Sequence, residues 1–409
     1  MGPTESNWLH SPSRRKALAA LAGVVAASPV VGSRVSAQLD PRPLKDHKRW
    51  PGLDEMMTAF DFEPIMFANL PQSVYDYTAH GDGSEFTLRR NRQAFEWVDI
   101  VAGTAVDRSR VDLSCELFGM PLTYPIMVAP TAFQLPLHPD GESGMYRAAT
   151  AAANTPMIVS QNTSTPIDRL APAAKGRLWC QFYPVNSLEN SKEILDRALT
   201  AGCAAVVVTV DQQASYYERS LRSRNLGGRG TGRGGRGGAA TPATSASGPA
   251  RYRLVAGRLW YTWDYLDQIR QMVKVPLLVK GILTAEDAAL CLEHGVDGIV
   301  VSNHGGRSMD YGPSTLEVLP EIVATVTRRI PVLIDSGFRR GSDILKALAL
   351  GADAVLLGRA TRWALGAFGA PGAQRLLEII QRELVEAAAA AGRPTRASID
   401  ASIVRTRFG

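Results

Sequence analysis

Residues 302–307 (SNHGGR) combine side chains that could remove a proton beside a bound anion. His304 is the only histidine placed at the end of an expected strand, and Arg307 lies three residues beyond it. An imidazole can act as a general base near neutral pH, and a guanidinium can hold an anion through two hydrogen bonds. The two glycines between them would let a ligand approach the backbone. A lone histidine is more often structural, so the hypothesis of a catalytic base depends on its companions.

Two charged residues elsewhere in the chain support a base at this position. Asp211 follows the strand expected at 202–209, and its carboxylate could orient His304 and favour the protonated imidazole. Lys280 ends the apolar strand expected at 277–280. A buried lysine is costly unless it is paired, which predicts an anionic partner, either a carboxylate or a reduced cofactor. A salt bridge within the protein remains the alternative role of this lysine.

Glycine and arginine recur after the last two expected strands, in residues 337–341 (GFRRG) and 358–359 (GR). In barrels of alternating strands and helices, turns at these two places bind phosphate through backbone N–H groups and guanidinium forks. The pattern predicts a phosphorylated ligand. It leaves open whether that ligand is a cofactor or a substrate.

The elements that would position these residues are indicated by a repeated unit, a glycine followed by a continuous apolar run. Its copies are residues 202–209, 295–302 and 351–358. Such a unit is typical of a helix that ends at glycine, followed by a parallel strand buried on both faces. Further apolar runs of the same kind are residues 125–129, 157–160, 178–183, 277–280 and 332–335.

Eight strand-then-helix units predict an α/β protein with a (β/α)8 TIM barrel over residues 121–409. An N-terminal helical segment over residues 38–120 is expected to pack on the barrel. The alternative is a doubly wound open sheet, which usually has a glycine-rich fingerprint after its first strand. Residues 129–133 (APTAF) do not match that fingerprint.

The composition is that of a globular protein, with 409 residues, 45% hydrophobic and 21% charged. It excludes collagen-like, coiled-coil and wholly disordered proteins. The formal net charge of +6 is concentrated in residues 1–37 and 218–250, so it says little about partners of the remaining chain. The four cysteines have no zinc-site spacing, and we expect no metal.

The N-terminus resembles a twin-arginine export signal over residues 1–37. Residues 13–16 (SRRK) precede an apolar run at 17–31, and small residues follow at 35–37 (VSA). A run of about 15 residues is shorter than the ~20 that span a bilayer. This resemblance predicts an exported protein, periplasmic or otherwise extracytoplasmic, although a retained anchor or a simple tail is the alternative.

Residues 226–250 (LGGRGTGRGGRGGAATPATSASGPA) interrupt the pattern between the fourth and fifth strands. Their composition cannot form a core, which predicts a flexible insertion that could cover the mouth of the barrel. An Arg/Gly-rich nucleic-acid-binding segment is the alternative. Such segments usually carry aromatic residues for stacking and this one has none, so we expect no nucleic-acid partner.

Three segments together resemble the FMN-dependent 2-hydroxy acid oxidase and dehydrogenase family, which includes glycolate oxidase and lactate oxidase. They are residues 278–288 (LVKGILTAEDA), 302–313 (SNHGGRSMDYGP) and 335–359 (DSGFRRGSDILKALALGADAVLLGR). The resemblance covers nearly all of residues 55–409. It implies an FMN cofactor and oxidation of a small L-2-hydroxy acid, such as lactate or glycolate, to the 2-oxo acid. Flavin N5 would accept the electrons.

Several properties stay open under this resemblance. O2 would reoxidise the flavin and give H2O2, and the alternative is a dehydrogenase that passes electrons to a quinone or cytochrome. A flavin-binding barrel without turnover is a third, non-enzymatic reading. Members of the family are often tetramers, so we expect a homo-oligomer.

The resemblance also implies roles for individual residues. His304 would be the catalytic base, Asp211 its partner, and Lys280 the group that stabilises negative charge on the reduced flavin. Arg307 would bind the substrate carboxylate, and Tyr183, which we count among the catalytic residues, would hydrogen-bond the substrate together with Tyr77. The flavin ring would be lined by Pro130, Thr131, Ala132, Ser160, Gln181, Thr209, Lys280 and Ser302. The ribityl chain and phosphate would be held by Asp335, Gly337, Arg339, Gly358 and Arg359.

The chain departs from the family pattern in two places. Tyr217 stands where members usually carry a second substrate-binding arginine, with Arg219 close by. Asn162 stands where the family often has a tryptophan, which predicts a roomier or more polar pocket.

Overall fold

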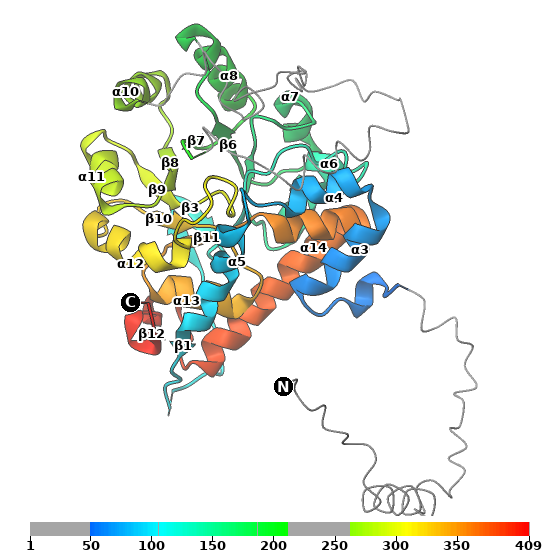
Figure 1. The fold of residues 1–409 in the computed structure, drawn as a ribbon, viewed down its shortest axis with the longest axis vertical. Coiled ribbons are helices and arrows are strands. Elements are labelled where there is room, and N and C mark those ends of the chain that lie inside the picture. The colour runs from blue at the N-terminus through cyan, green and yellow to red at the C-terminus, as the bar shows by residue number, and fades with distance from the viewer. Residues whose placement is uncertain (1–49, 105, 186, 212–261, 409) are drawn as a thin grey trace, which may run out of the picture. The chain divides into compact units, whose positions relative to one another are not determined.

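The computed structural model describes residues 50–104, 106–185, 187–211 and 262–408, which fall almost wholly in the unit Gly52–Gly409 (Figure 1). The export signal, the insertion at 226–250, Tyr217 and Arg219 lie outside the described residues.

Eight parallel strands close into a barrel at the centre of this unit (Figure 1). In chain order they are β4 (Ile126–Val128), β5 (Met157–Val159), β6 (Leu178–Phe182), β7 (Val206–Thr209), β8 (Leu277–Ile282), β9 (Gly298–Val301), β10 (Val332–Ile334) and β11 (Ala354–Leu357). The last strand, β11, pairs in parallel with the first, β4. The predicted TIM barrel is therefore confirmed, and the open doubly wound sheet is excluded.

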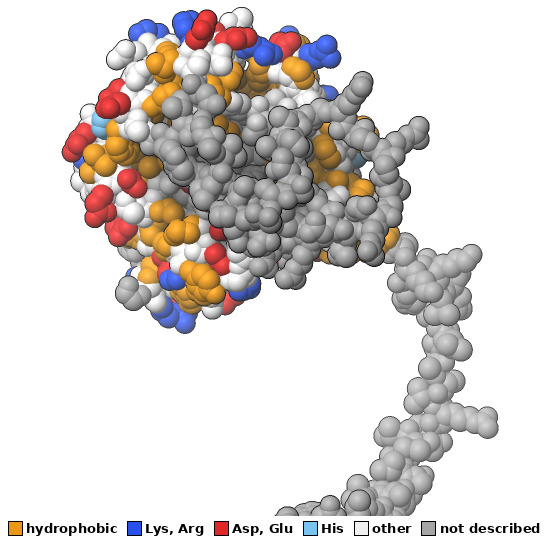
Figure 2. Space-filling model, turned by 45° about the horizontal axis from the view of Figure 1, so that its top comes forward, with side chains coloured by type: hydrophobic (Ala, Val, Ile, Leu, Met, Phe, Trp, Pro, Cys, Tyr) orange, Lys and Arg blue, Asp and Glu red, His pale blue; other side chains and the backbone are white. Residues whose placement is uncertain are grey.

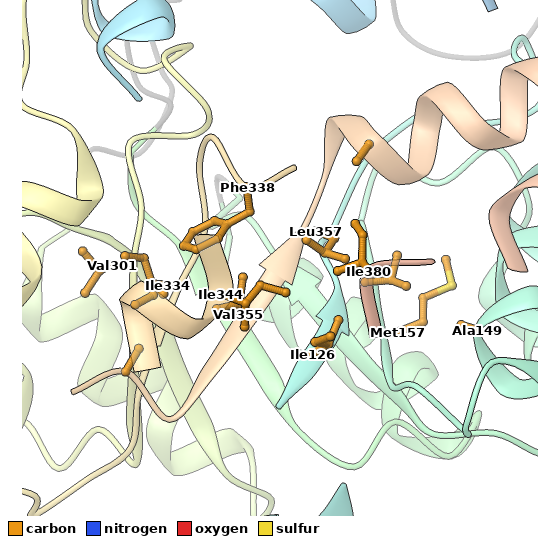
Figure 3. Packing of buried hydrophobic residues seen from close by; sticks show 14 of the residues in the cluster. Ile126, Ala149, Met157, Val301, Ile334, Phe338, Ile344, Val355, Leu357 and Ile380 are labelled. Carbon is orange, nitrogen blue, oxygen red and sulfur yellow. The ribbon is translucent and has the colours of Figure 1, made fainter. Parts of the chain in front are cut away.

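The strands are buried on both faces, which is why each reads as an unbroken apolar run. One side chain from each strand fills the barrel interior: Met127, Ile158, Trp179, Val207, Leu278, Val300, Leu333 and Leu356. The neighbouring residues point outward and pack against the helices, as Ile126 and Leu357 do near Ile380 in Figure 3. Fully burying one such aliphatic side chain contributes about 1.5–3 kcal/mol.

Helices surround the barrel (Figure 1). They are α6 (Gly141–Ala151), α7 (Ile167–Leu170) with η5 (Ala171–Ala173), α8 (Leu188–Thr200), α10 (Trp263–Met272), α11 (Ala285–Glu293), α12 (Thr315–Val326), α13 (Gly341–Ala349) and α14 (Arg359–Ala390). The start of α11 shows how the sequence sets these boundaries, because Thr284 Oγ1 accepts a hydrogen bond from the Asp287 N–H, 3.1 Å away. Helix α14 is kinked at Phe368 and Gly369, and its first turns carry residues of the candidate site.

The segment before the barrel is helical only in part. It contains η2 (Leu53–Glu55), η3 (Ala59–Asp61), α3 (Phe62–Asn69), α4 (Gln72–Ala79), α5 (Phe86–Gln93) and η4 (Ala94–Trp97), followed by β1 (Val98–Ile100), β2 (Cys115–Leu117) and β3 (Met120–Leu122). Residues 38–120 were expected to be helical, and the three strands depart from that expectation. Three residues are too few to show an alternating pattern.

The short strands close parts of the fold away from the candidate site. Strand β1 pairs antiparallel with β12 (Val404–Thr406), which follows η7 (Arg396–Ser398) and η8 (Ala401–Ile403). Strands β2 and β3 form a hairpin whose Phe118 reaches the first residue of β9, Gly298, and packs near Trp179. The amino-terminal end of the barrel is therefore plugged, which leaves the carboxyl ends of the strands for a ligand.

The outer surface carries no marked separation of charge on the face shown in Figure 2. Over the described part of that face, acidic and basic side chains are interspersed with hydrophobic ones. Within the described residues, no helix has the length and hydropathy needed to span a membrane.

Candidate active site

Charged residues at the carboxyl ends of four neighbouring strands meet in one network. His304 Nδ1 lies 2.7 Å from Asp211 Oδ1, and Lys280 Nζ lies 3.8 Å from Asp211 Oδ2. Lys280 Nζ also lies 3.3 Å from Asp335 Oδ2 and donates a hydrogen bond to Ser302 Oγ at 2.7 Å. These residues come from the ends of β7 to β10, so the barrel brings together groups that are up to 124 positions apart in the printed sequence.

Burial and the attraction of opposite charges have opposing effects on the pKa values of Asp211 and Lys280. Burial tends to raise the pKa of Asp211, but Lys280 and His304 outweigh it and hold that pKa below its usual range. Burial tends to lower the pKa of Lys280, but Asp211 and Asp335 outweigh it and raise that pKa. Both groups therefore stay ionised at neutral pH, and the anionic partner expected for Lys280 is a pair of carboxylates.

His304 is held in an orientation suited to a base. Burial, together with the positive charges of Lys280 and Arg307, outweighs the attraction of Asp211 and lowers the pKa of the imidazole. The ring is therefore neutral at pH 7. Because Nδ1 faces Asp211, Nε2 is the nitrogen available to take a proton.

The backbone around His304 is fixed from both sides. His304 has a positive φ of 58°, and its N–H donates to Ser302 Oγ at 3.1 Å. The N–H of Gly305 donates to Ser336 Oγ at 2.9 Å, and Ser336 Oγ donates to Asp335 Oδ1 at 2.8 Å. A left-handed conformation of a non-glycine residue persists only where the surroundings enforce it, as these bonds do here.

A buried pair of asparagines also holds this loop, and sequence reasoning missed it. Asn91 of α5 and Asn303 exchange side-chain hydrogen bonds of 2.9 and 2.8 Å, and Asn303 Oδ1 accepts the N–H of Gly306 at 3.0 Å. The N-terminal segment thus reaches across the barrel mouth to the residue before His304. Asn91 sits in a polar helix and carries no local signal that would have marked it.

Arg307 and Tyr77 lie against each other. Arg307 Nη1 donates to the Tyr77 carbonyl at 2.8 Å, and its Cζ lies 4.9 Å from the centre of the Tyr77 ring. Tyr77 comes from α4, which places the N-terminal segment at the site. The third residue expected to contact substrate, Tyr183, follows β6, and its N–H donates to Gln161 Oε1 at 2.6 Å. Gln161 is another residue that sequence reasoning missed.

The residues expected around the flavin ring contain buried polar atoms that lack a hydrogen-bond partner in the part of the chain that the structure describes. Gln181 Nε2 and Thr209 Oγ1 form no hydrogen bond with any described residue. Ser160 Oγ donates to Gln181 Oε1 at 3.2 Å, which turns the amide nitrogen of Gln181 toward another acceptor. Buried polar groups are nearly always bonded, so these two atoms indicate a ligand with polar edges, and the ring of FMN fits that requirement.

The loop after β4 carries three more of the residues expected to line the flavin ring. It contains Pro130, Thr131 and Ala132, and Gln134 Nε2 donates to the carbonyl and the hydroxyl of Thr131 at 3.2 and 3.0 Å. The carbonyl of Ala132 accepts a hydrogen bond from Arg362 Nη1. Asn162, the departure noted after β5, is exposed, and its carbonyl accepts the N–H of Phe133 at 3.2 Å.

Arg339 has the properties of an anion-binding group. Its guanidinium is buried, stacks 4.3 Å from the ring centre of Trp363 and donates from Nη1 to the Phe338 carbonyl. Its Nε forms no hydrogen bond with any described residue. Burial, and next the charge of Arg92, lower its pKa to about 10. Gly337 has a φ of +90°, and a Cβ there would lie 2.4 Å from the Asn91 carbonyl oxygen, so only glycine fits.

Arg359 donates hydrogen bonds to backbone carbonyls, which were not predicted from the sequence. Its Nε, Nη1 and Nη2 donate to the carbonyls of Thr78, Gly305 and His80 at 2.9, 2.6 and 2.7 Å. Burial, and next Arg307 and Arg339, lower its pKa to about 9. Nη1 and Nη2 each keep a second N–H. The remaining donors of Arg339 and Arg359 therefore suit a phosphate dianion. A Cβ at Gly358 would be in ordinary contact with Ala129 and Thr131, at 3.7 and 3.8 Å.

The structure thus brings the predicted residues to one end of the barrel, with Tyr77 added from α4. It leaves Tyr217 and Arg219 outside the described residues. A further buried arginine, Arg362 of α14, contacts the site and was not singled out from the sequence. Its position on the apolar first turns of a helix gave no signal of function.

Comparisons with known proteins point in the same direction as this geometry. Residues 66–406 match the family model described as FMN-dependent dehydrogenase. The chain is similar to a peroxisomal (S)-2-hydroxyacid oxidase of Arabidopsis thaliana, at 36% identity over 87% of this chain and 98% of that protein. It is also similar to an L-lactate oxidase of Nostoc sp., at 36% identity over 84% and 97% of the two chains. A solved structure of mandelate oxidase matches with a TM-score of 0.77 and 35% identity, over 87% of this chain and 99% of that chain.

Proposed function

The chain belongs to the FMN-dependent dehydrogenase family, and on that basis we propose that it oxidises a small L-2-hydroxy acid such as lactate or glycolate. It is an FMN-dependent oxidoreductase that acts on the CH–OH group of 2-hydroxy acids and produces 2-oxo acids. The observation that carries the proposed roles is the juxtaposition of a neutral His304, paired with Asp211, and the Arg307–Tyr77 contact.

Each of these residues has a defined task in this proposal. Arg307 binds the substrate carboxylate through its guanidinium fork, and the Tyr77 and Tyr183 hydroxyls orient the substrate. His304 takes a proton from the substrate at Nε2, and Asp211 stabilises the imidazolium that results. Lys280 offsets the negative charge that develops as the substrate is oxidised.

The bound cofactor supplies a two-electron acceptor beside the substrate. Gln181 and Thr209 would meet its polar ring edge, since their buried donors lack partners among the described residues. Arg339 and Arg359 would hold its phosphate. The remaining predicted residues would complete the site: Pro130, Thr131, Ala132, Ser160, Ser302, Asp335, Gly337 and Gly358.

The experiment that tests this function is an anaerobic titration of the FMN-loaded protein with L-lactate, glycolate and larger 2-hydroxy acids. The flavin absorbance should bleach with at least one of them, and it should recover when O2 is admitted. A flavin spectrum that none of these acids changes would contradict the proposal and would favour a binding protein without turnover.

We propose O2 as the final electron acceptor, because the similar proteins are named oxidases. Each turnover then yields one 2-oxo acid and one H2O2. Little H2O2 in air, together with rapid turnover when a quinone or cytochrome is added, would instead identify a dehydrogenase.

The location and assembly of the protein are two further proposals. Residues 13–37 support export through the twin-arginine route, and exchange of Arg14 and Arg15 for lysine should retain the protein in the cytoplasm. Family resemblance supports a homotetramer, which light scattering of the purified FMN-loaded protein would reveal. A monomeric mass at micromolar concentration would contradict it.

A further inference from the structure

Arg362 lies on the first turns of α14, and only 4% of its surface is exposed. We propose that Arg362 is a positioning residue that fixes Tyr77 and thereby sets the affinity of the site for the substrate carboxylate. This inference rests on the proposed function, in which Tyr77 contacts the substrate.

The contacts of Arg362 connect two parts of the site. Its Nε donates to Thr78 Oγ1 at 3.0 Å, next to Tyr77 on α4. Its Nη1 donates to the carbonyl of Ala132, in the loop after β4. Its Cζ lies 5.5 Å from the centre of the Tyr77 ring. One guanidinium therefore holds the helix that carries Tyr77 against the loop that is expected to line the cofactor.

The Tyr77 ring is in contact with two guanidinium groups, because Arg307 lies 4.9 Å from the same ring centre. Phe133 and His80 pack edge-on against the ring, each with ring centres 5.9 Å from it. Cation–π contacts of this kind are strongest where water is excluded. The ring is thus held on several sides, by Phe133 from the loop after β4 and by Arg362 from α14 as well as by residues of the His304 loop.

The charge of Arg362 is expensive to bury, which indicates a specific purpose. Both of its hydrogen-bond acceptors are uncharged, and burial lowers its pKa to about 10. The carboxylate that acts on it from a distance, Glu142, accepts hydrogen bonds from the N–H groups of Gln134 and Ser164. An apolar side chain would fill this space without the desolvation free energy of a buried charge. The benefit of arginine therefore lies in its two hydrogen bonds and in the positive charge that it places over the Tyr77 ring.

Arg362 and Arg359 share Arg307 as an electrostatic neighbour, but among these two arginines Tyr77 influences the pKa of Arg362. The pKa of Arg359 is lowered by burial and then by Arg307 and Arg339. Arg362 is influenced, after burial, by Tyr77 and then by Arg307. The geometry agrees, because Arg362 lies over the Tyr77 ring and bonds to Thr78 beside it. Its other acceptor, the Ala132 carbonyl, lies in the loop expected to line the cofactor, so the loss of Arg362 should affect substrate binding more strongly than cofactor binding.

The test compares Arg362→Met and Arg362→Lys with the control Arg375→Met. Arg375 lies on the same helix but donates to the Met56 carbonyl, so it serves as a matched arginine that Tyr77 does not contact. Three quantities are measured for each FMN-loaded protein: the dissociation constant of oxalate, read from the flavin absorbance, and KM and kcat for the best 2-hydroxy acid. FMN affinity of the apoprotein and the melting temperature are measured alongside.

We expect Arg362→Met to weaken oxalate binding and raise KM by about tenfold, because the variant loses both hydrogen bonds of the guanidinium and its contact with the Tyr77 ring. The kcat value should change by less than about threefold, since His304 and Asp211 keep their geometry. Arg362→Lys should recover part of the loss, because it keeps the charge and one donor. Arg375→Met should leave oxalate binding and KM unchanged.

Three results would overturn the inference. They are unchanged oxalate binding in Arg362→Met, a lysine variant no better than the methionine variant, or losses of FMN affinity and melting temperature that account for the whole effect. Oxalate binding needs no turnover, so the comparison remains readable even if no 2-hydroxy acid bleaches the wild-type flavin. If no 2-hydroxy acid bleaches the wild-type flavin, the proposed function is rejected, but the role of Arg362 in anion binding is still tested by oxalate.

Discussion

Asp211 Oδ1 lies 2.7 Å from His304 Nδ1 although the two residues are contributed by different strands, β7 and β9. The second oxygen of the same carboxylate, Oδ2, lies 3.8 Å from Lys280 Nζ. One buried carboxylate thus serves both the base and the lysine. Without it, Lys280 would keep Asp335 as a carboxylate partner, but the imidazolium form of His304 would lose the negative charge that stabilises it.

His304→Gln should keep FMN bound and abolish its reduction by substrate. Glutamine is similar in size but cannot take a proton, and general-base catalysis contributes about 10²–10⁴-fold in rate. Anaerobic stopped-flow measurement of flavin absorbance reports the loss. Bleaching at the wild-type rate in a variant with full FMN content would show that another residue is the base.

The activity of the wild-type protein should persist to unusually acidic pH. A protonated imidazole cannot accept a proton, so kcat/KM falls as pH drops through the pKa of His304. Burial and the nearby cations hold that pKa below its usual 6.5, so the acidic limb should lie below pH 6.5. A kcat/KM profile measured at constant ionic strength tests this, and a limb centred above pH 7 would be inconsistent with a neutral, depressed His304.

Asp211→Asn should separate two effects of the carboxylate. The amide keeps a hydrogen-bond partner for His304 but removes the negative charge that stabilises the imidazolium, so kcat should fall by about 10²–10⁴-fold. The same change removes an interaction that raises the pKa of His304, so the acidic limb of the kcat/KM profile should move to lower pH. A fall in rate with the limb shifted upward would mean that Asp211 acts in another way. Circular dichroism and FMN content control for folding, since Lys280 also loses a partner.

Arg307→Lys should mainly weaken substrate binding. Lysine supplies a point charge in place of a planar fork, and it cannot stack on Tyr77 as the guanidinium does. We expect KM to rise by about 10–100-fold, which corresponds to the free energy of one charge-assisted hydrogen bond with good geometry. Steady-state kinetics with the best 2-hydroxy acid measure the change. An unchanged KM would show that another cation binds the carboxylate.

Much of the fold could be predicted because a parallel barrel strand is buried on both faces. The copies at 202–209, 295–302 and 351–358 contain β7, β9 and β11, and the glycine that begins each one marks the end of a helix. Residues at the strand ends then converge by topology, which is why His304 and Lys280 could be placed together without any knowledge of contacts.

The parts that could not be predicted depend on pairings between distant segments. The Asn91–Asn303 bonds join positions 212 residues apart, and nothing near either asparagine marks the other. Arg359 was expected to hold phosphate, yet three of its five N–H groups bond to the backbone carbonyls of Thr78, His80 and Gly305. Tyr77 was identified only through family resemblance, because a tyrosine in a short helix is usually a packing residue.

Arg339→Met should weaken FMN binding without altering the proton chemistry of the site. The guanidinium is buried with an Nε that bonds to no described residue, and burial and Arg92 lower its pKa to about 10. A bound phosphate would supply an acceptor for Nε and a negative charge beside the guanidinium, so removing the cation should raise the dissociation constant of FMN by about 10–100-fold. Quenching of FMN fluorescence on titration with apoprotein measures it, and riboflavin, which lacks the phosphate, is the control ligand. Equal weakening for FMN and riboflavin would show that Arg339 supports the fold or the flavin ring rather than the phosphate. A selective loss for FMN would locate the phosphate beside Arg339, at the turn after β10.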